Sequence, residues 1–261
     1  MKALSIASTG MLAQQLNVEV ISNNLANMNT HGYKRQRVEF QDLLYQNLER
    51  VGAASSDTGT VVPSGIQIGV GVRTGSVYRI TEQGNLVTTG NTYDMAVNGE
   101  GYFRIEQPDG TDAYTRAGTF QLSPDGQIVN AEGYVVAPGI TVPPEAVDVS
   151  INPQGEVQVK LAGQVDPQTM GQLELVTFPN PAGLEAIGEN MLLETPASGL
   201  ASVGVPGTDG YGTIMQGFLE TSNVNAVEEI TSLITAQRAY EMNSKVISTA
   251  DEMLSTTSNL R

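Results

Sequence analysis

The chain has 261 residues, no cysteine, a single histidine and a formal net charge of -15. The absence of cysteine excludes disulfides, thiolate catalysis and Cys-ligated metal, and one histidine excludes any site that needs two imidazoles. With 13 basic residues against 28 acidic ones, the chain lacks the clustered positive charge that binds phosphate backbones and anionic membranes, so no nucleic-acid partner and no lipid insertion are expected.

The N-terminal residues are predicted to form a long amphipathic helix. Apolar side chains recur there at intervals of three and four, the spacing of a coiled-coil-like seam, with one polar member: Leu4, Ala7, Met11, Gln14, Val18, Ile21, Leu25 and Met28. The helix is expected to end before Gly32, a natural helix stop. Ser, Thr and Gly among the first ten residues interrupt any apolar leader, so no cleaved signal peptide is expected. No apolar run is long enough to predict a transmembrane helix.

Two regions of different composition follow the first predicted helix. Residues 36–70 are interpreted as an extended connector, because 51–65 are rich in Ala, Ser, Gly and Thr. Residues 71–221 are interpreted as an all-β domain, antiparallel and sandwich-like or barrel-like. Short alternating segments recur there, as at 70–80, 99–105 and 172–178, and turn signals separate them at 108–110, 123–126 and 152–155.

A second long helix is predicted near the C-terminus. Leu233, Tyr240, Ile247 and Leu254 are seven apart, and a second apolar row contains Val246 and Met253. The stripe is wider than one two-stranded seam requires, so the helix should touch more than one neighbour. Ser222 or Asn223 is the expected N-cap. The predicted fold is α+β, with residues 1–35 and 222–261 forming a terminal helical domain around the central β-rich domain.

The search for catalytic, cofactor-binding or metal-binding residues yields none. His31 lies at a helix end with no nucleophile motif in the chain, which favours a loop residue. Asp109–Asp112 and Asp125–Gly126 resemble calcium loops but lack the ligand spacing, so turns are predicted. Gly69–Val72 has no following helix that would bind a dinucleotide. No residue pattern in the chain therefore indicates a catalytic site.

Four asparagines crowd the end of the first predicted helix: Asn23, Asn24, Asn27 and Asn29. Asparagine is a poor helix former, because its amide competes for backbone hydrogen bonds. These amides are expected either to bond neighbouring chains or to cap the turn into Gly32–Tyr33. A polar helix end with an Asn-rich cap is the alternative.

Residues 22–35 resemble the Asn-rich signature near the N-terminus of bacterial flagellar rod and hook proteins. Residues 222–230 and 234–245 resemble the C-terminal signature of the same family. The central segments 44–46, 63–73, 83–86 and 99–103 resemble the distal-rod members in particular, and the chain length also fits them better than the hook protein.

The resemblance implies a structural subunit of the distal rod, with no catalysis and no cofactor. Such a subunit is expected to polymerise helically into the rigid, hollow drive shaft that carries motor torque to the hook, with both terminal helices lining an inner tube. The implied partners are other copies, the proximal rod proteins, the hook protein, the surrounding L/P ring and the flagellar type III export apparatus. The implied location is the periplasmic rod of the basal body, and residues 46–63 are expected to lie between subunits.

Two alternatives stay open from the sequence. One is a sister axial protein, a proximal rod or hook subunit. The other, from a different class, is a secreted β-rich peptidoglycan hydrolase, which would need two placed carboxylates in a cleft. The predicted assembly interface consists of Leu4, Met11, Val18, Ile21, Asn23, Asn24, Leu25, Asn27, Asn29, Gly32, Tyr33, Asn223, Asn225, Leu233, Gln237, Arg238, Tyr240, Asn243, Ile247 and Leu254.

Overall fold

The computed structural model describes residues 2–49, 65–164 and 166–259. The chain divides into two compact units. The helical unit comprises Met1–Leu25, Gln36–Tyr78 and Asn225–Arg261, and the β unit comprises Ala26–Arg35 and Arg79–Val224. The α+β class predicted from the sequence is confirmed, with a helix near each end of the chain and antiparallel strands between them.

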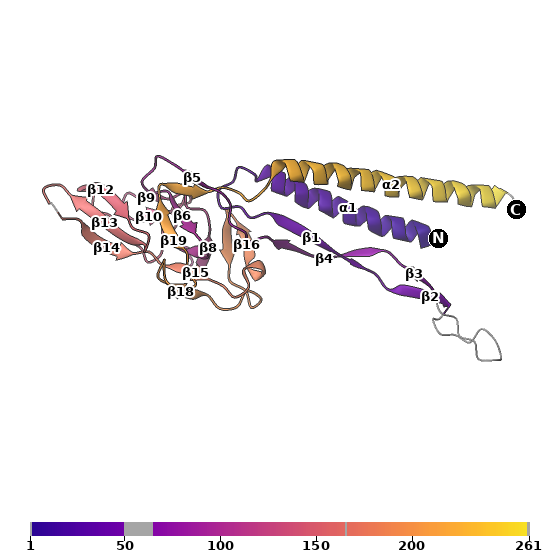
Figure 1. Ribbon diagram of the computed structural model, residues 1–261, viewed down its shortest axis with the longest axis horizontal. Coiled ribbons are helices and arrows are strands. Elements are labelled where there is room, and N and C mark those ends of the chain that lie inside the picture. Colours follow the sequence, from indigo (N-terminus) through magenta and orange to yellow (C-terminus); the bar gives the residue numbers. More distant parts are fainter. Residues whose placement is uncertain (1, 50–64, 165, 260–261) are drawn as a thin grey trace. The chain divides into compact units, whose positions relative to one another are not determined.

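Two long helices dominate the helical unit. Helix α1 spans Lys2–Ala26 and helix α2 spans Ala226–Asn259, and they run side by side (Figure 1). Four of the eight buried residues described on these helices are alanines, namely Ala7, Ala13, Ala236 and Ala250. At Gly10 an added Cβ would lie 2.9 Å from Asn243 Nδ2, so glycine lets the Asn243 side chain lie against α1. Small residues therefore set how closely the helices approach.

The start of α2 differs from the prediction. Neither Ser222 nor Asn223 is the N-cap. The Asn225 carbonyl accepts the first helical hydrogen bond from the Glu229 amide, and its side-chain Oδ1 accepts a bond of 3.1 Å from the Val227 amide. A side-chain acceptor for an N-terminal amide defines the N-cap, which here is Asn225. All three candidates are good N-cap residues, so composition alone did not distinguish them.

Paired strands accompany the helices within this unit. Strand β1 (Gln36–Asp42) pairs with β4 (Val72–Arg79), and β2 (Tyr45–Glu49) pairs antiparallel with β3 (Ile66–Gly69). The Val72 amide donates to the Thr9 hydroxyl of α1 at 3.4 Å, which links the strand pair to the helix. The grouping therefore differs from the predicted connector, because residues 36–49 and 66–70 contain strands that cluster with the helices. Residues 50–64 of that predicted connector lie outside the described residues.

The β unit consists of short antiparallel strands. Its described strands are β5 (Leu86–Thr88), β6 (Met95–Asn98), β7 (Tyr102–Glu106), β8 (Asp112–Thr115), β9 (Gln121–Leu122), β10 (Ile128–Val129), β11 (Val135–Val136), β12 (Ala146–Ile151), β13 (Glu156–Leu161), β14 (Gln168–Gln172), β15 (Leu175–Thr177), β16 (Glu185–Gly188), β17 (Met191–Leu193), β18 (Ser202–Gly204), β19 (Thr213–Gln216) and β20 (Phe218–Glu220). A 3-10 turn lies at Pro181–Gly183.

The strands form a nine-stranded sheet around β7, a three-stranded sheet of β12, β13 and β14, and the pairs β19–β6 and β20–β5. The three predicted turns each connect consecutive strands, β7 to β8, β9 to β10 and β12 to β13. Their glycines, Gly110, Gly126 and Gly155, have φ values of 80°, 80° and 79°, as those turns require. A sandwich-like or barrel-like closure of these sheets stays a prediction.

One predicted strand is wrong. Residues 172–178 were expected to form a single alternating strand, but Gln172 ends β14 and Leu175 begins β15, which belongs to a different sheet. Between them the Leu173 amide donates to the Gly155 carbonyl at 2.7 Å. Leu175 and Val176 are both fully buried, because the chain passes between two packed layers here and both faces are covered. Alternation of residue types does not reveal such a crossing.

The core of the β unit is closed and apolar. Phe103, Phe120, Ile105, Leu175 and Ile214 are each at most 1% exposed. The rings of Phe103 and Phe120 pack edge to face with centroids 5.1 Å apart, a favourable arrangement of two aromatic quadrupoles. These large side chains form one buried cluster inside the β unit.

Candidate assembly interface

The predicted seam lies between α1 and α2. Leu4, Met11 and Val18 of α1 are half-buried and Ile21 is buried, while on α2 Leu233, Asn243 and Ile247 are half-buried. Leu25 is half-buried as well, whereas Gln237, Arg238, Tyr240 and Leu254 are exposed. Contact within one chain therefore covers the predicted seam only partly, and its role as a coiled coil stays a prediction.

A second apolar surface of α2 is largely exposed to solvent. Val246 is 48% exposed and Met253 is 60% exposed, and both belong to the second apolar row found in the sequence. Ile234 and Met242 are 45% and 64% exposed on the same helix. A helix surrounded by apolar residues normally packs on several sides. These rows are suited to contacts that a single chain does not supply.

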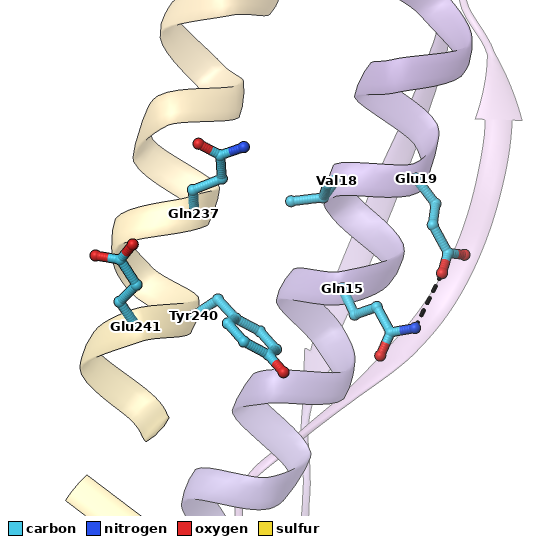
Figure 2. Close-up of a pocket in the computed structure, with 6 residues that line it drawn as sticks. All are labelled: Gln15, Val18, Glu19, Gln237, Tyr240 and Glu241. Carbon is cyan, nitrogen blue, oxygen red and sulfur yellow. Dashed lines mark hydrogen bonds between the residues drawn. The ribbon is translucent and has the colours of Figure 1, made fainter. Parts of the chain in front are cut away.

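The space between the helices forms a groove of about 520 Å³. Figure 2 shows Val18 of α1 and Tyr240 of α2 pointing into it. Gln15 and Glu19 lie on the α1 side, and Gln237 and Glu241 lie on the α2 side. Gln15 Nε2 donates to Glu19 Oε1 at 3.1 Å. The groove thus has apolar side chains in the middle and a carboxylate on each rim.

Asn24 ties three elements of the helical unit together and is 1% exposed. Its Nδ2 donates to the Gln36 carbonyl at 2.8 Å and to Glu229 Oε2 at 3.2 Å, and its Oδ1 accepts from the Gln36 amide at 2.8 Å. These bonds join α1 to β1 and to the first turn of α2. Because they lie within one chain, the amide of Asn24 supports the subunit itself, whatever role it has in assembly.

The other asparagines of the predicted interface differ from one another in exposure and in hydrogen bonding. Asn27 closes the turn after α1, because its carbonyl accepts from the Thr30 amide and its Oδ1 accepts from the Thr30 hydroxyl at 3.1 Å. Asn23 and Asn29 are exposed. Asn223 belongs to the β unit, where its Oδ1 accepts from the Arg35 amide at 2.7 Å. The expected cap of the turn is thus present at Asn27, and the expected bonds to neighbouring chains stay a prediction.

Gly32 and Tyr33 lie in the chain segment that enters the β unit. Gly32 has a φ of +71°, and a Cβ there would lie 2.6 Å from the Ala117 amide nitrogen, so no larger residue fits. Its amide donates to the Glu220 carbonyl at 2.9 Å, and the Tyr33 amide donates to Thr30. Glycine is therefore needed here for a close backbone approach as well as for ending a helix.

A buried ion cluster next to this segment was missed by the sequence analysis. Glu220, 1% exposed, accepts from Lys34 Nζ at 2.6 Å and from Arg116 Nε at 2.8 Å. The Gly84 amide also donates to Glu220, and Lys34 donates to the Glu82 carbonyl. Lys34 and Glu220 are 186 positions apart, so no local pattern signals the contact.

The charges of this cluster set its pKa values. Burial alone would raise the pKa of Glu220, but the positive charges of Arg116 and Lys34 outweigh it and the pKa is lowered. The pKa of Lys34 is lowered, mainly by burial and also by the positive charge of Arg116, although Glu220 acts in the opposite direction. The cluster joins the chain just after α1 to the chain just before α2, and so fixes where both cross the β unit.

The turn at Asp109, which resembles a calcium loop in sequence, is held by local hydrogen bonds. The Asp109 carboxylate accepts from the hydroxyl and the amide of Thr111, which lowers the pKa of Asp109 and closes the turn predicted there. Within residues 2–49, 65–164 and 166–259, no group of three His, Cys, Asp or Glu side chains is arranged to hold a metal ion. No helix in the described part of the chain is long and apolar enough to cross a membrane.

A β unit with an apolar core and a pair of long helices with exposed apolar side chains are features of a structural subunit. Comparison with known families agrees. Residues 4–34 match the family described as "Flagella basal body rod protein", residues 96–159 match "Flagellar hook protein FlgE/F/G D1 domain", and residues 215–260 match "Flagellar basal body rod FlgEFG protein C-terminal".

Individual relatives narrow this class. The chain is 61% identical to the flagellar basal-body rod protein FlgG of Caulobacter vibrioides over the full length of both chains. It is 52% identical to FlgG of Agrobacterium fabrum over 98% of this chain and 97% of that one. It is 28% identical, over both full lengths, to the flagellar hook-basal body complex protein FlhP of Bacillus subtilis. The chain belongs to the FlgG family of flagellar basal-body rod proteins.

The resemblance seen in the two terminal signatures is therefore confirmed. The chain is a structural subunit of the flagellar distal rod and serves motility as part of the basal body. Identity is much higher to relatives named FlgG than to FlhP, which speaks against the sister-protein alternative. The family is one of structural rod proteins, so the hydrolase alternative loses its support.

Proposed function

We propose that copies of this chain polymerise helically, through the exposed faces of α1 and α2, into the rigid hollow shaft that carries torque from the motor to the hook. The observation that carries this proposal is the pair of exposed apolar rows on α2, which include Ile234, Met242, Val246 and Met253. A tube of copies would bury them, and burial of apolar area is the main source of association free energy.

In this proposal the terminal helices form a coiled-coil inner tube and the β unit lies outside it. The seven-residue spacing of the seam on both helices supports the coiled coil. The acidic β unit supports an outer position, because like charge keeps outer surfaces solvated and apart. Residues 46–63 would contact adjacent subunits, and Leu48, which is 58% exposed, supports this for the part that is described.

The further partners follow from the family. The shaft would join proximal rod proteins at one end and the hook protein at the other, and it would turn inside the L/P ring. Subunits would reach the periplasmic rod through the flagellar type III export apparatus. The flagellar names of the relatives and of the matched families support this placement. The predicted interface residues, from Leu4 to Leu254, belong to the proposal as the surfaces that meet in the tube.

The test is polymerisation of the purified full chain. Sedimentation velocity over a range of concentrations, with electron microscopy of the pelleted material, should show monomer at low concentration and rods of constant diameter above a threshold. Far-ultraviolet circular dichroism should show helix content rising with polymerisation, because long helices gain order from packing. A chain that stays monomeric at every concentration, with unchanged helix content, would contradict the proposal.

A further inference from the structure

The groove between α1 and α2 is built from the same short pattern on both helices. Gln15, Val18 and Glu19 line it from α1, and Gln237, Tyr240 and Glu241 line it from α2. Each set reads Gln, then an apolar residue three positions later, then Glu. In Figure 2 the middle members, Val18 and Tyr240, point between the helices. Tyr240 is 43% exposed, so the chain itself leaves the middle of the groove partly open.

The rims of this groove are negative. Glu19 is exposed on α1 and Glu241 is exposed on α2. In Figure 2 the two carboxylates lie on the outer flanks, with Val18 and Tyr240 between them. A partner that fits must supply apolar side chains for the middle and positive charges for the flanks. A helix with one apolar and basic face meets both needs.

The outer face of α2 has that composition. We define the basic ridge as Ile234, Arg238, Met242 and Lys245, which follow one another at steps of four, four and three and so share one face of the helix. All four side chains are exposed. On the described parts of α1 and α2 the basic residues are Lys2, Arg238 and Lys245, so the ridge has two of the three. Its basic residues are one heptad apart, a rise of about 10 Å.

We propose that the basic ridge of one copy docks in the acidic groove of the next copy. Ile234 and Met242 would cover Val18 and Tyr240, while Arg238 and Lys245 would face Glu19 and Glu241. This inference rests on the proposed polymerisation and names the surfaces that meet. Ridge and groove are different faces of one chain, so the contact is head to tail, and contacts of that kind build open helical polymers.

Charge complementarity is the reason for choosing a second copy as the occupant. The groove has a negative rim, and the ridge is the exposed face of the same two helices that carries two positive side chains. Complementary charges at a contact mainly fix its register and speed its formation, while the apolar centre supplies the burial. Glu241 also lies four residues before Lys245 on α2, so Glu19 is the rim carboxylate that tests the intermolecular contact most directly.

The experiment is a charge swap in the full chain. Glu19→Lys and Arg238→Glu each place like charges across the proposed contact, and each should raise the protein concentration needed for polymerisation about tenfold at low salt. The double variant, Glu19→Lys with Arg238→Glu, restores opposite charges and should polymerise within about threefold of wild type. Glu132→Lys and Lys160→Glu, both exposed in the β unit, make the same changes in net charge and serve as matched controls.

The outcomes separate the two proposals. If wild-type protein forms rods and both single variants form them equally well, or if the double variant is no better than the singles, the ridge-and-groove contact is wrong and the proposed function stands. If wild-type protein forms no rods, the proposed function itself fails. Far-ultraviolet circular dichroism of the dilute variants should match wild type, because both substituted positions are exposed on helices.

Discussion

The two units bury different kinds of side chain. The fully buried apolar residues of the β unit are large, such as Phe103, Phe120 and Leu175, whereas those of the helical unit are mostly small, such as Ala7 and Ala236. Most of the large apolar side chains that remain exposed belong to the helical unit. The β unit therefore has the larger buried core, and the helical unit has the larger share of exposed apolar side chains.

This difference explains how one chain serves as a building block. A unit with a closed core can fold before assembly and keep its shape under load. A unit with uncovered rows gains its full packing only among copies, so its stability and its assembly are linked. The following predictions test that division.

The largest effect is expected from Phe103→Ala in the β-unit core. Removing this ring leaves a cavity beside Phe120 and should lower the free energy of unfolding by about 3–5 kcal/mol. Thermal unfolding followed by near-ultraviolet circular dichroism measures it. Leu12→Ala in α1, where the side chain is 64% exposed, is the contrasting variant and should change monomer stability by less than about 0.5 kcal/mol. Equal losses of unfolding free energy for the two variants would contradict the proposed difference in packing between the β unit and the helical unit.

Glu220→Gln should destabilise the β unit by about 3 kcal/mol, because it leaves Lys34 and Arg116 buried without their counter-charge. Denaturant unfolding of the full chain measures the change. Glu174→Gln is the matched control, since that carboxylate pairs with Arg104 at a half-exposed site and should contribute little. A loss as small as that of the control would show that the cluster is unimportant for stability.

Ile247→Asp should abolish polymerisation while the β unit of the monomer keeps its unfolding temperature. The side chain is half-buried on the seam of α2, and a carboxylate there cannot be desolvated without a partner. Sedimentation and thermal unfolding of the same sample provide both measurements. Ile247→Leu keeps the apolar character and should polymerise. Normal rods from the aspartate variant would refute the role given to the seam.

The pH dependence of the β unit should follow Glu220. Its pKa is lowered in the folded protein, so the unfolded chain binds more protons between the folded pKa and the ordinary value of 4.5. Its contribution to stability is therefore present above pH 4.5 and is lost as the pH falls through the folded pKa. Unfolding curves at decreasing pH should show wild type losing stability more steeply than Glu220→Gln. Parallel curves for the two proteins would contradict this assignment.

The smallest effect is expected at the start of α2. Asn225→Ala removes the N-cap and should cost about 1 kcal/mol locally, visible as faster hydrogen exchange in the first turn of the helix. Asn225→Asp keeps an acceptor at the same position and should leave exchange unchanged. If Ser222→Ala accelerated exchange more than Asn225→Ala, the cap assignment would be wrong.

The periodic parts of this fold could be predicted locally. The apolar spacing around Val18 and Tyr240 predicted both helices, because a helix repeats every 3.6 residues and the spacing of its apolar residues is visible in the sequence. The glycines of the hairpins at 108–110 and 152–155 marked their turns, because few other residues adopt positive φ. The two signatures near the chain ends identified the family.

Other features depend on residues far apart in the chain. The break between Gln172 and Leu175 exists because the chain changes sheets there. Asn225 is the N-cap of α2, although Ser222 and Asn223 are equally suitable by residue type. Asn24 was noticed as one of four asparagines, but its partners Gln36 and Glu229 were not foreseeable.

The sequence by itself determined that this chain has two long amphipathic helices, a β-rich centre and the signatures of a flagellar axial protein. Those properties follow from short-range periodicity, turn chemistry and local motifs. Only the tertiary structure decided that Glu220 joins Lys34 and Arg116, and that Val18 and Tyr240 share a groove with carboxylate rims. Such contacts join residues more than a hundred positions apart, and folding alone brings them together.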